Sequence, residues 1–168
     1  MKIDQINQFS KSEFINAFSS IFEHSPWVAD QAYSLKPFQS IEDLHKKMVD
    51  VVRGSGLEPQ LKLICAHPEL AGKAAVRKDL TDHSLNEQSG AGLDQCSTEE
   101  FELLQSLNAK YLTKFGFPFI LAVKGHNRQS IIQNFANRLN NEKAVEFQEC
   151  LEQIYRIAQF RLETYVNS

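Results

Sequence analysis

The spacing of apolar residues predicts that the chain folds as a succession of α-helices. Near the amino terminus, Phe14 and Phe18 stand four residues apart, and further apolar residues continue the same face over residues 10–22. Ser10 and Glu13 have the spacing of a capping box, in which each side chain bonds the backbone N–H of the other residue. The sequence therefore predicts a helix that opens at Ser10.

Caps and helix-stopping residues predict where the other helices begin and end. Serine favours the N-cap, proline the first turn, and glycine the position after the last turn. On this basis we expect helices after Ser25-Pro26, from Ser40 to Gly54, from about Pro59 to Ala66, from Pro68, from Ser97 to Gly116, after Ser130, and over about 142–165.

Two stretches do not fit a simple helical pattern. Residues 77–97 are polar and contain Gly90 and Gly92, so we expect a long structured loop that can hold one turn of helix. Residues 117–123, FPFILAV, form either a short extended segment or a buried stretch. The whole pattern predicts an all-α fold, a single compact domain of seven to nine helices over residues 1–168.

Size, composition and charge favour one intracellular globular domain. With 168 residues, 42% hydrophobic residues and twelve phenylalanines, the chain can build a single core. The net charge is -3 and no basic stripe is present, which argues against a nucleic-acid partner. No apolar run approaches the roughly 20 residues that span a bilayer, so we expect no membrane partner. The amino terminus lacks the apolar core of a signal peptide, which indicates an intracellular protein.

The cysteines and histidines do not suggest a metal or redox site. Cys65, Cys96 and Cys150 lie far apart without a CxxC pair, so we expect each to be a small buried hydrophobic side chain. None of the five histidines stands three or four residues from another histidine or a cysteine on an evident helix face. We therefore expect no metal site.

Arg161 departs from the pattern of the last helix. The buried stripe of that helix includes Ile154, and Arg161, seven residues later, points within about 20° of the same direction. Arg156, by contrast, stands among glutamates, and we expect it to face solvent. A core-facing guanidinium is costly unless an anion or several acceptors meet it. Arg161 therefore either reaches the surface or an acid near the helix end, or binds an anionic ligand through its planar fork.

His67 stands between an apolar helix end and Pro68. If Pro68 is the first residue of a new helix, His67 lies at its cap, near free backbone N–H groups and the positive end of the helix dipole. That field lowers the pKa of a histidine and favours a bound anion. A neutral imidazole that accepts and returns a proton near neutral pH is a common acid–base catalyst. The other interpretation is a structural histidine at a helix cap.

Residues 84–93, SLNEQSGAGL, also allow two interpretations. Ser84 and Glu87 have the spacing of a capping box, which predicts a helix start. Alternatively, the segment is a glycine-flanked polar loop that offers a hydroxyl, a carboxylate and an amide to a small polar heterocycle.

Five strings in this chain together resemble one enzyme family. They are FEHSPWVA at 22–29, HPELAGKA at 67–74, SLNEQSGAGL at 84–93, LNAKYLTKFGFPFILAVKG at 107–125 and RIAQFRL at 156–162. In order and spacing they are similar to the 2-oxo-4-hydroxy-4-carboxy-5-ureidoimidazoline (OHCU) decarboxylases, which complete the conversion of urate to (S)-allantoin. The resemblance extends from about residue 5 to the carboxyl end.

The resemblance implies roles for particular residues. His67 matches the family's catalytic histidine, described as the proton donor, Glu87 its catalytic carboxylate, and Arg161 its substrate-holding arginine. The positions that match substrate-contacting segments are Pro68, Ser84, Leu85, Asn86, Glu87 and Gln88, and then Phe119, Ile120, Leu121, Ala122 and Val123.

The resemblance also implies an all-helical, cofactor-free, cytoplasmic enzyme that acts as a homodimer on a small molecule. The substrate carries its own electron sink, so no pyridoxal, thiamine or metal motif is required, and none is found. No transthyretin-like domain is fused to the chain, and the end YVNS is not a peroxisomal signal, as expected of a free-standing bacterial enzyme. Two other classes stay open at this point: a ureide hydrolase on the same scaffold, and a non-catalytic helical module.

Overall fold

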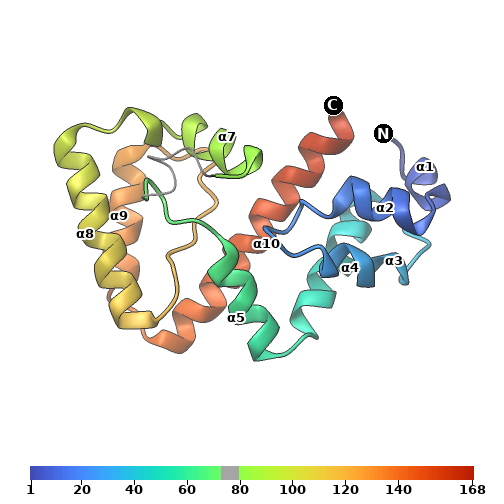
Figure 1. Cartoon of the computed structure of the whole chain (residues 1–168), viewed down its shortest axis with the longest axis horizontal. Coiled ribbons are helices and arrows are strands. Elements are labelled where there is room, and N and C mark those ends of the chain that lie inside the picture. Colours follow the sequence, from blue (N-terminus) through green and yellow to red (C-terminus); the bar gives the residue numbers. More distant parts are fainter. Residues whose placement is uncertain (73–79) are drawn as a thin grey trace. The chain divides into compact units, whose positions relative to one another are not determined.

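Helices are the regular elements of this protein (Figure 1). The computed structural model describes residues 1–72 and 80–168. Its elements are α1 (Ile3–Gln8), α2 (Lys11–Phe18), α3 (Trp27–Tyr33), α4 (Ile41–Arg53), α5 (Leu57–Ala66), α7 (Asp82–Gly90), the 3₁₀ helix η1 (Leu93–Gln95), α8 (Thr98–Phe115), α9 (Arg128–Arg138) and α10 (Lys143–Asn167). The described residues thus hold nine α-helices and no strand, which confirms the all-α class.

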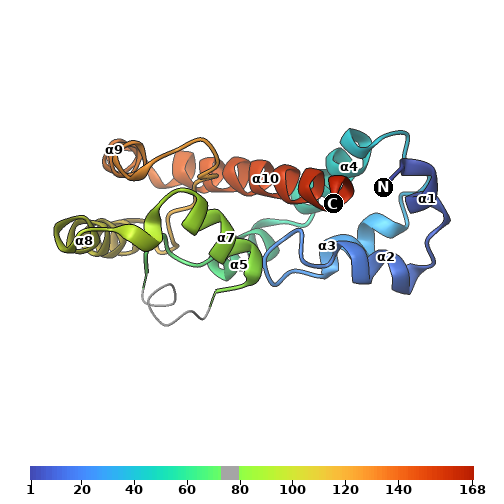
Figure 2. The same cartoon turned by 90° about the horizontal axis from the view of Figure 1, so that it is seen from above.

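The chain groups into two compact units, each of which is described by itself. The first comprises Met1–Ala66 and Ile154–Ser168, and the second comprises His67–Gln153. Helix α10 contributes to both, and Figure 2 shows it as one unbroken helix.

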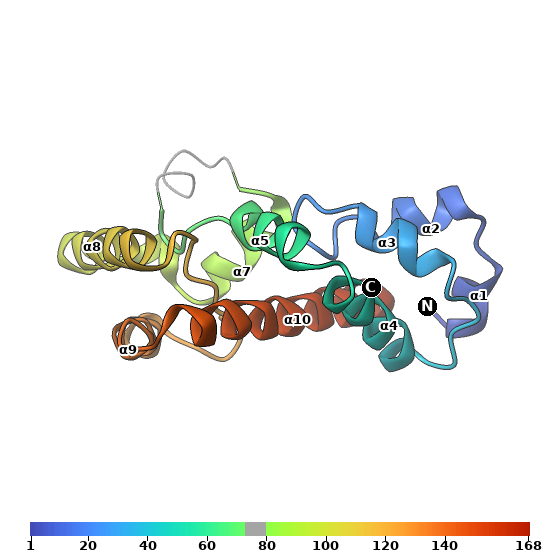
Figure 3. The same ribbon diagram turned by 90° about the horizontal axis from the view of Figure 1, so that it is seen from below.

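In the first unit, α3 packs against both α2 and α4 (Figure 3). The predicted capping box opens α2: Glu13 N donates to Ser10 Oγ at 3.3 Å, and Ser10 N donates to Glu13 Oε2 at 2.8 Å. Phe14 and Phe18 are buried with ring centroids 4.8 Å apart, as their spacing predicts. Helix α2 ends at Phe18 rather than continuing to residue 22.

In the second unit, α8 and α9 lie side by side (Figure 1). Ser97 caps helix α8 as predicted, and Glu100 completes a capping box with it. Gly116 ends the helix in the left-handed conformation, with φ +78°. The core of this unit is aromatic: Phe119 and Phe135 stack with ring centroids 3.8 Å apart.

Two predicted helix starts are displaced along the chain. Pro26, not Ser25, occupies the N-cap of α3. Asn127 caps α9, because its Oδ1 accepts from Ser130 N at 2.9 Å, so Ser130 stands at the third helical position instead of the cap. An asparagine three residues earlier competes successfully with serine as a cap.

The prediction of a loop over residues 77–97 is wrong for residues 80–97, the part that the structure describes. Thr81 Oγ1 accepts from Ser84 N at 3.3 Å and caps α7, and η1 follows. Ser84 therefore lies inside a helix and is not its N-cap. Hydrophobic periodicity does not predict this helix, because its buried residues, Ser84 and Gln88, are polar and form no apolar stripe. Residues 77–79 lie outside the described part.

The predicted helix start at Pro68 is also wrong. Residues 67–72 contain bends and turns but no helix, and Ala71 adopts φ +49°. His67 is therefore not an N-cap of a helix that begins at Pro68, and the argument for a dipole-lowered pKa does not apply. The continuation of that predicted helix over 73–79 lies outside the described residues.

The stretch 117–123 has no regular helix or strand and is mostly buried, so the alternative of a buried stretch is confirmed. Of the cysteines, Cys150 is buried as predicted, whereas Cys65 is exposed and Cys96 is half-buried. The prediction was wrong for Cys65 because it lies on an outer face of α5.

Candidate active site

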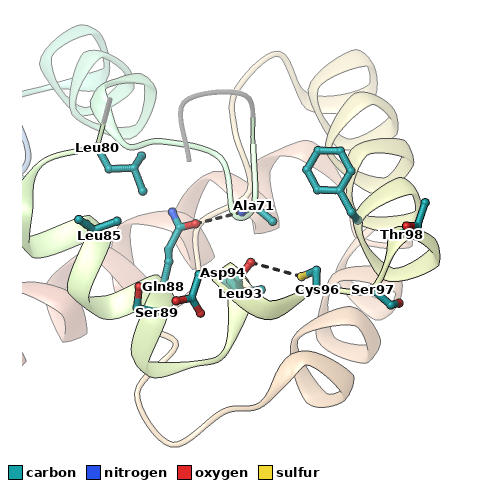
Figure 4. A pocket seen from close by; sticks show the side chains of 11 residues that line it. Ala71, Leu80, Leu85, Gln88, Ser89, Leu93, Asp94, Cys96, Ser97 and Thr98 are labelled. Carbon is teal, nitrogen blue, oxygen red and sulfur yellow. Dashed lines mark hydrogen bonds between the residues drawn. The ribbon is translucent and has the colours of Figure 1, made fainter. Parts of the chain in front are cut away.

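His67 lies in a short irregular segment that is fastened to α7. Its side chain is buried. Two residues later, Glu69 O accepts from Gln88 Nε2 at 3.3 Å. Ala71 N donates to Gln88 Oε1 at 3.0 Å, as Figure 4 shows. Helix α7 also carries Glu87, the neighbour of Gln88. One amide side chain therefore joins the segment of the candidate proton donor to the helix of the candidate carboxylate.

Because the predicted stretch Ser84–Gln88 is helical, its side chains point in different directions and differ in exposure. Ser84 and Gln88 are buried, Glu87 is half-buried, and Leu85 and Asn86 are exposed. Residues three and four apart share a helix face. Ser84, Glu87 and Gln88 therefore share one face of α7.

A cavity of about 460 Å³ lies in the second unit beside α7, which is the size range of small-molecule sites (Figure 4). Leu85 and Gln88 of the predicted stretch line it, together with Ser89, Asp94, Cys96 and Phe101. Burial raises the pKa of the Cys96 thiol, and the nearby carboxylate of Glu100 acts in the same direction. This keeps Cys96 protonated near neutral pH, which disfavours a nucleophilic role.

The backbone of Phe119–Val123 is hydrogen-bonded by side chains of the same compact unit. All five side chains are buried and apolar, so only the backbone is polar. Arg138 Nη1 donates to Ile120 O, and Ala122 N donates to Gln153 Oε1 at 3.0 Å. The Arg138 guanidinium also lies 4.2 Å from the centre of the Phe119 ring. The backbone path of this stretch is thereby fixed.

Arg138 forms a buried ion pair with Glu146. Its Nη2 lies 2.9 Å from Glu146 Oε2, and Tyr111 donates its hydroxyl to the same carboxylate. Burial raises the pKa of Tyr111, so it stays protonated and remains a donor. Burial disfavours the charge of Arg138, but the hydrogen bonds to Glu146, together with the charge interactions of Cys150, Glu146 and Tyr111, outweigh this and raise its pKa.

Arg161 faces the core of the first unit, as the periodicity predicts. Its side chain is 3% exposed, its Nη2 lies 2.7 Å from Glu23 Oε2, and its Nη1 donates to Ser20 O at 3.4 Å. Arg156 is exposed, also as predicted. Pairing with an acid, one of the two alternatives for Arg161, is therefore present, although the acid is buried and lies far from the helix end in sequence.

The predicted site residues fall in both units. His67, Pro68, the stretch 84–88 and the stretch 119–123 belong to the second, and Arg161 belongs to the first. The polar side chains that hold these residues escaped sequence analysis. They are Glu23, Gln105, Asn108, Arg138, Glu146 and Gln153. A signal existed only for Glu23, the single acid in the string FEHSPWVA.

The described residues contain neither a metal-binding cluster nor a membrane-spanning helix. No group of three or more histidine, cysteine or acidic side chains could hold a metal ion there. No helix in residues 1–72 and 80–168 is long and apolar enough to cross a membrane.

Comparison with known proteins gives a consistent family match. The chain matches the family described as OHCU decarboxylase over residues 7–163. The uric acid degradation bifunctional protein PucL of Bacillus subtilis is 45% identical over 95% of this chain, which spans 32% of that protein. The 2-oxo-4-hydroxy-4-carboxy-5-ureidoimidazoline decarboxylase of Haloferax volcanii is 38% identical over 96% of this chain and 94% of its own length. A crystal structure of an (S)-allantoin synthase superposes with a TM-score of 0.77 at 30% identity, covering 98% of this chain and 54% of that one.

Proposed function

Because the chain belongs to the OHCU decarboxylase family, we propose that it converts OHCU to (S)-allantoin with loss of carbon dioxide. The observation that carries this proposal is the family match over residues 7–163, with a Haloferax relative of nearly the same extent. The Bacillus relative is a longer, bifunctional protein, so only the part of its activity that this family performs is proposed here.

The chemistry needs an electron sink and well-placed protons. The substrate carries a hydroxyl and a carboxylate on one ring carbon, next to a carbon–nitrogen double bond. When the bond to the carboxylate breaks, carbon dioxide leaves and its electron pair forms a double bond to the ureido-bearing carbon. The former imine pair moves onto the ring nitrogen, which takes up a proton. The hydroxyl then gives up its proton to become the ring carbonyl, and the ureido-bearing carbon takes up a proton. The protein therefore has to orient the ring and deliver that proton to one face.

We assign the proton transfer to His67 and the hydrogen bonding of the substrate's ring or hydroxyl to Glu87. Gln88 supports this assignment. It follows Glu87 in α7, and its side chain is hydrogen-bonded to the backbone of residues 69 and 71, just after His67. General acid–base help of this kind contributes about 10²–10⁴-fold in rate. Positioning and electrostatics supply most of the remainder.

We assign substrate anchoring to Arg161 and to the backbone of Phe119–Val123. Glu23 already faces the Arg161 guanidinium, so the pair presents fixed N–H donors and little net charge. Such donors suit the polar edge of a ring better than a freely moving cation would. The buried apolar side chains of 119–123 leave the backbone as the polar contact in that stretch.

The activity is tested by generating OHCU in place. Urate, urate oxidase and hydroxyisourate hydrolase are mixed with the purified protein, and circular dichroism follows the allantoin produced. We expect rapid appearance of the (S) enantiomer. Slow, racemic product that matches the protein-free mixture would reject the proposal, because the intermediate also decays without an enzyme.

We also propose that residues 1–168 form a single family domain that works as a cytoplasmic homodimer. Light scattering of the purified protein at micromolar concentration tests the assembly. A mass of two chains is expected, and a mass of one chain at all concentrations would contradict it.

A further inference from the structure

Three amide side chains hold the backbone that follows His67. Besides the two bonds of Gln88, Asn108 Nδ2 donates to Leu70 O at 3.0 Å and Gln105 Nε2 donates to Ala71 O at 2.6 Å. Gln105 and Asn108 stand three residues apart on α8 and thus on the same face. Together the amides engage four polar groups of this backbone, which are Glu69 O, Leu70 O, Ala71 N and Ala71 O.

The orientation of the two α8 amides follows from their partners. A carbonyl oxygen can only accept a hydrogen bond, so each amide must turn its NH₂ group toward residues 70 and 71. Asn108 is buried, and its Oδ1 makes no hydrogen bond within the described residues. Within residues 1–72 and 80–168, the hydrogen bond found for the Asn108 side chain is the one to Leu70 O.

The backbone of residues 69–72 contains a conformation that residues with a side chain rarely adopt. Ala71 has φ +49°, a region that residues with a side chain rarely occupy. At Gly72 an added Cβ would lie 2.8 Å from the Cβ of Glu69, so a side chain cannot fit without movement. A segment in such a conformation persists only when the surrounding structure fixes it. The amides of α7 and α8 provide that constraint.

We propose that Gln105 and Asn108 are positioning residues that place the His67 imidazole for proton transfer. They act through the backbone of residues 69–71, and Pro68, whose φ is fixed by its ring, transmits the constraint to His67. This inference rests on the proposed role of His67. Proton transfer requires hydrogen-bond distance in the reacting complex, and a displacement of about 1 Å can cost about 10²-fold in rate.

The first test replaces Gln105 by methionine, which keeps the size of the side chain and removes its donor. Gln105 is half-buried, so the fold should tolerate the change. We expect kcat to fall by about 10-fold to 100-fold, with KM changed less than about threefold. Gln105→Lys, which retains an N–H donor, should recover part of the loss. Gln133→Met, on the exposed face of α9, is the matched control and should leave kcat unchanged.

A double-mutant cycle separates positioning from simple stability. In a His67→Ala background the imidazole is absent, so Gln105→Met should not lower the residual rate further. An equal loss in both backgrounds would overturn the inference, and so would an unchanged kcat in Gln105→Met. Far-ultraviolet circular dichroism and Tm verify that each variant is folded at the assay temperature.

A substrate-free measurement keeps this inference distinct from the proposed function. In NMR spectra of histidine-labelled protein, the His67 ring signal is assigned by its loss in His67→Ala. We expect Gln105→Met and Asn108→Asp to shift that signal, whereas the signals of His24 and His45, which belong to the first unit, stay in place. An unmoved His67 signal would contradict the inference even if the enzyme is active. An inactive wild-type protein would instead reject the proposed function.

Discussion

At the scale of single residues, the site depends on buried polar groups whose partners come from distant parts of the chain. The inward direction of Arg161 could be predicted, because it follows from helical periodicity alone. Its partner Glu23 could not, since no local rule links the turn after α2 to the last helix. The same holds for the partners of Gln105 and Asn108. Asn108 lies on the buried face of α8, but no local rule links it to the backbone of Leu70.

The Glu23–Arg161 pair gives a prediction at this scale. Glu23→Gln removes the charge that neutralises a guanidinium only 3% exposed. Loss of one partner of a buried pair costs about 3–5 kcal/mol in the free energy of unfolding, which chemical denaturation measures.

The matched control for that change is Glu58→Gln. Glu58 pairs with Lys62 at an exposed site on α5, and such surface pairs contribute little. Its unfolding free energy should stay within about 0.5 kcal/mol of wild type. Equal effects of the two substitutions would show that burial of the Glu23 pair is not what stabilises Arg161.

At the scale of elements, prediction succeeded where a cap and an apolar stripe coincide. Ser10, Ser40 and Ser97 all accept the expected backbone hydrogen bond at the start of their helices. Prediction failed for α7 and for the residues after Pro68. In α7 the buried residues Ser84 and Gln88 are polar, so hydrophobic periodicity carries no signal there. After Pro68 the backbone is bonded by amide side chains of α7 and α8, which lie far away in the sequence.

The cap of α7 provides a prediction at the scale of elements. Thr81→Ala removes the side-chain oxygen that accepts from Ser84 N, and it should lower the unfolding free energy by about 1 kcal/mol. Because α7 carries Glu87, kcat should fall as well. Thr113→Ala, at an exposed position within α8, is the control and should neither destabilise the protein nor slow it. Thermal unfolding and initial rates measured side by side would reveal a discrepancy.

At the scale of the whole molecule, the residues proposed to act together are distributed over both compact units. The second unit contains His67, α7 and the stretch 119–123, and the first contains Arg161 with its buried carboxylate. The all-α class was predictable because helix caps and spacing recur along the chain. The division into two units was not, because it depends on contacts between segments far apart in sequence, and α10 enters both units without a break.

The most direct test of the account compares wild type with His67→Ala in the formation of (S)-allantoin. The substitution removes the proposed proton donor from a segment whose backbone is held by other residues, so the fold should remain intact. We predict that kcat falls by about 10²–10⁴-fold while far-ultraviolet circular dichroism stays the same. A His67→Ala variant that forms (S)-allantoin at nearly the wild-type rate would contradict the assignment of this histidine and the mechanism built on it.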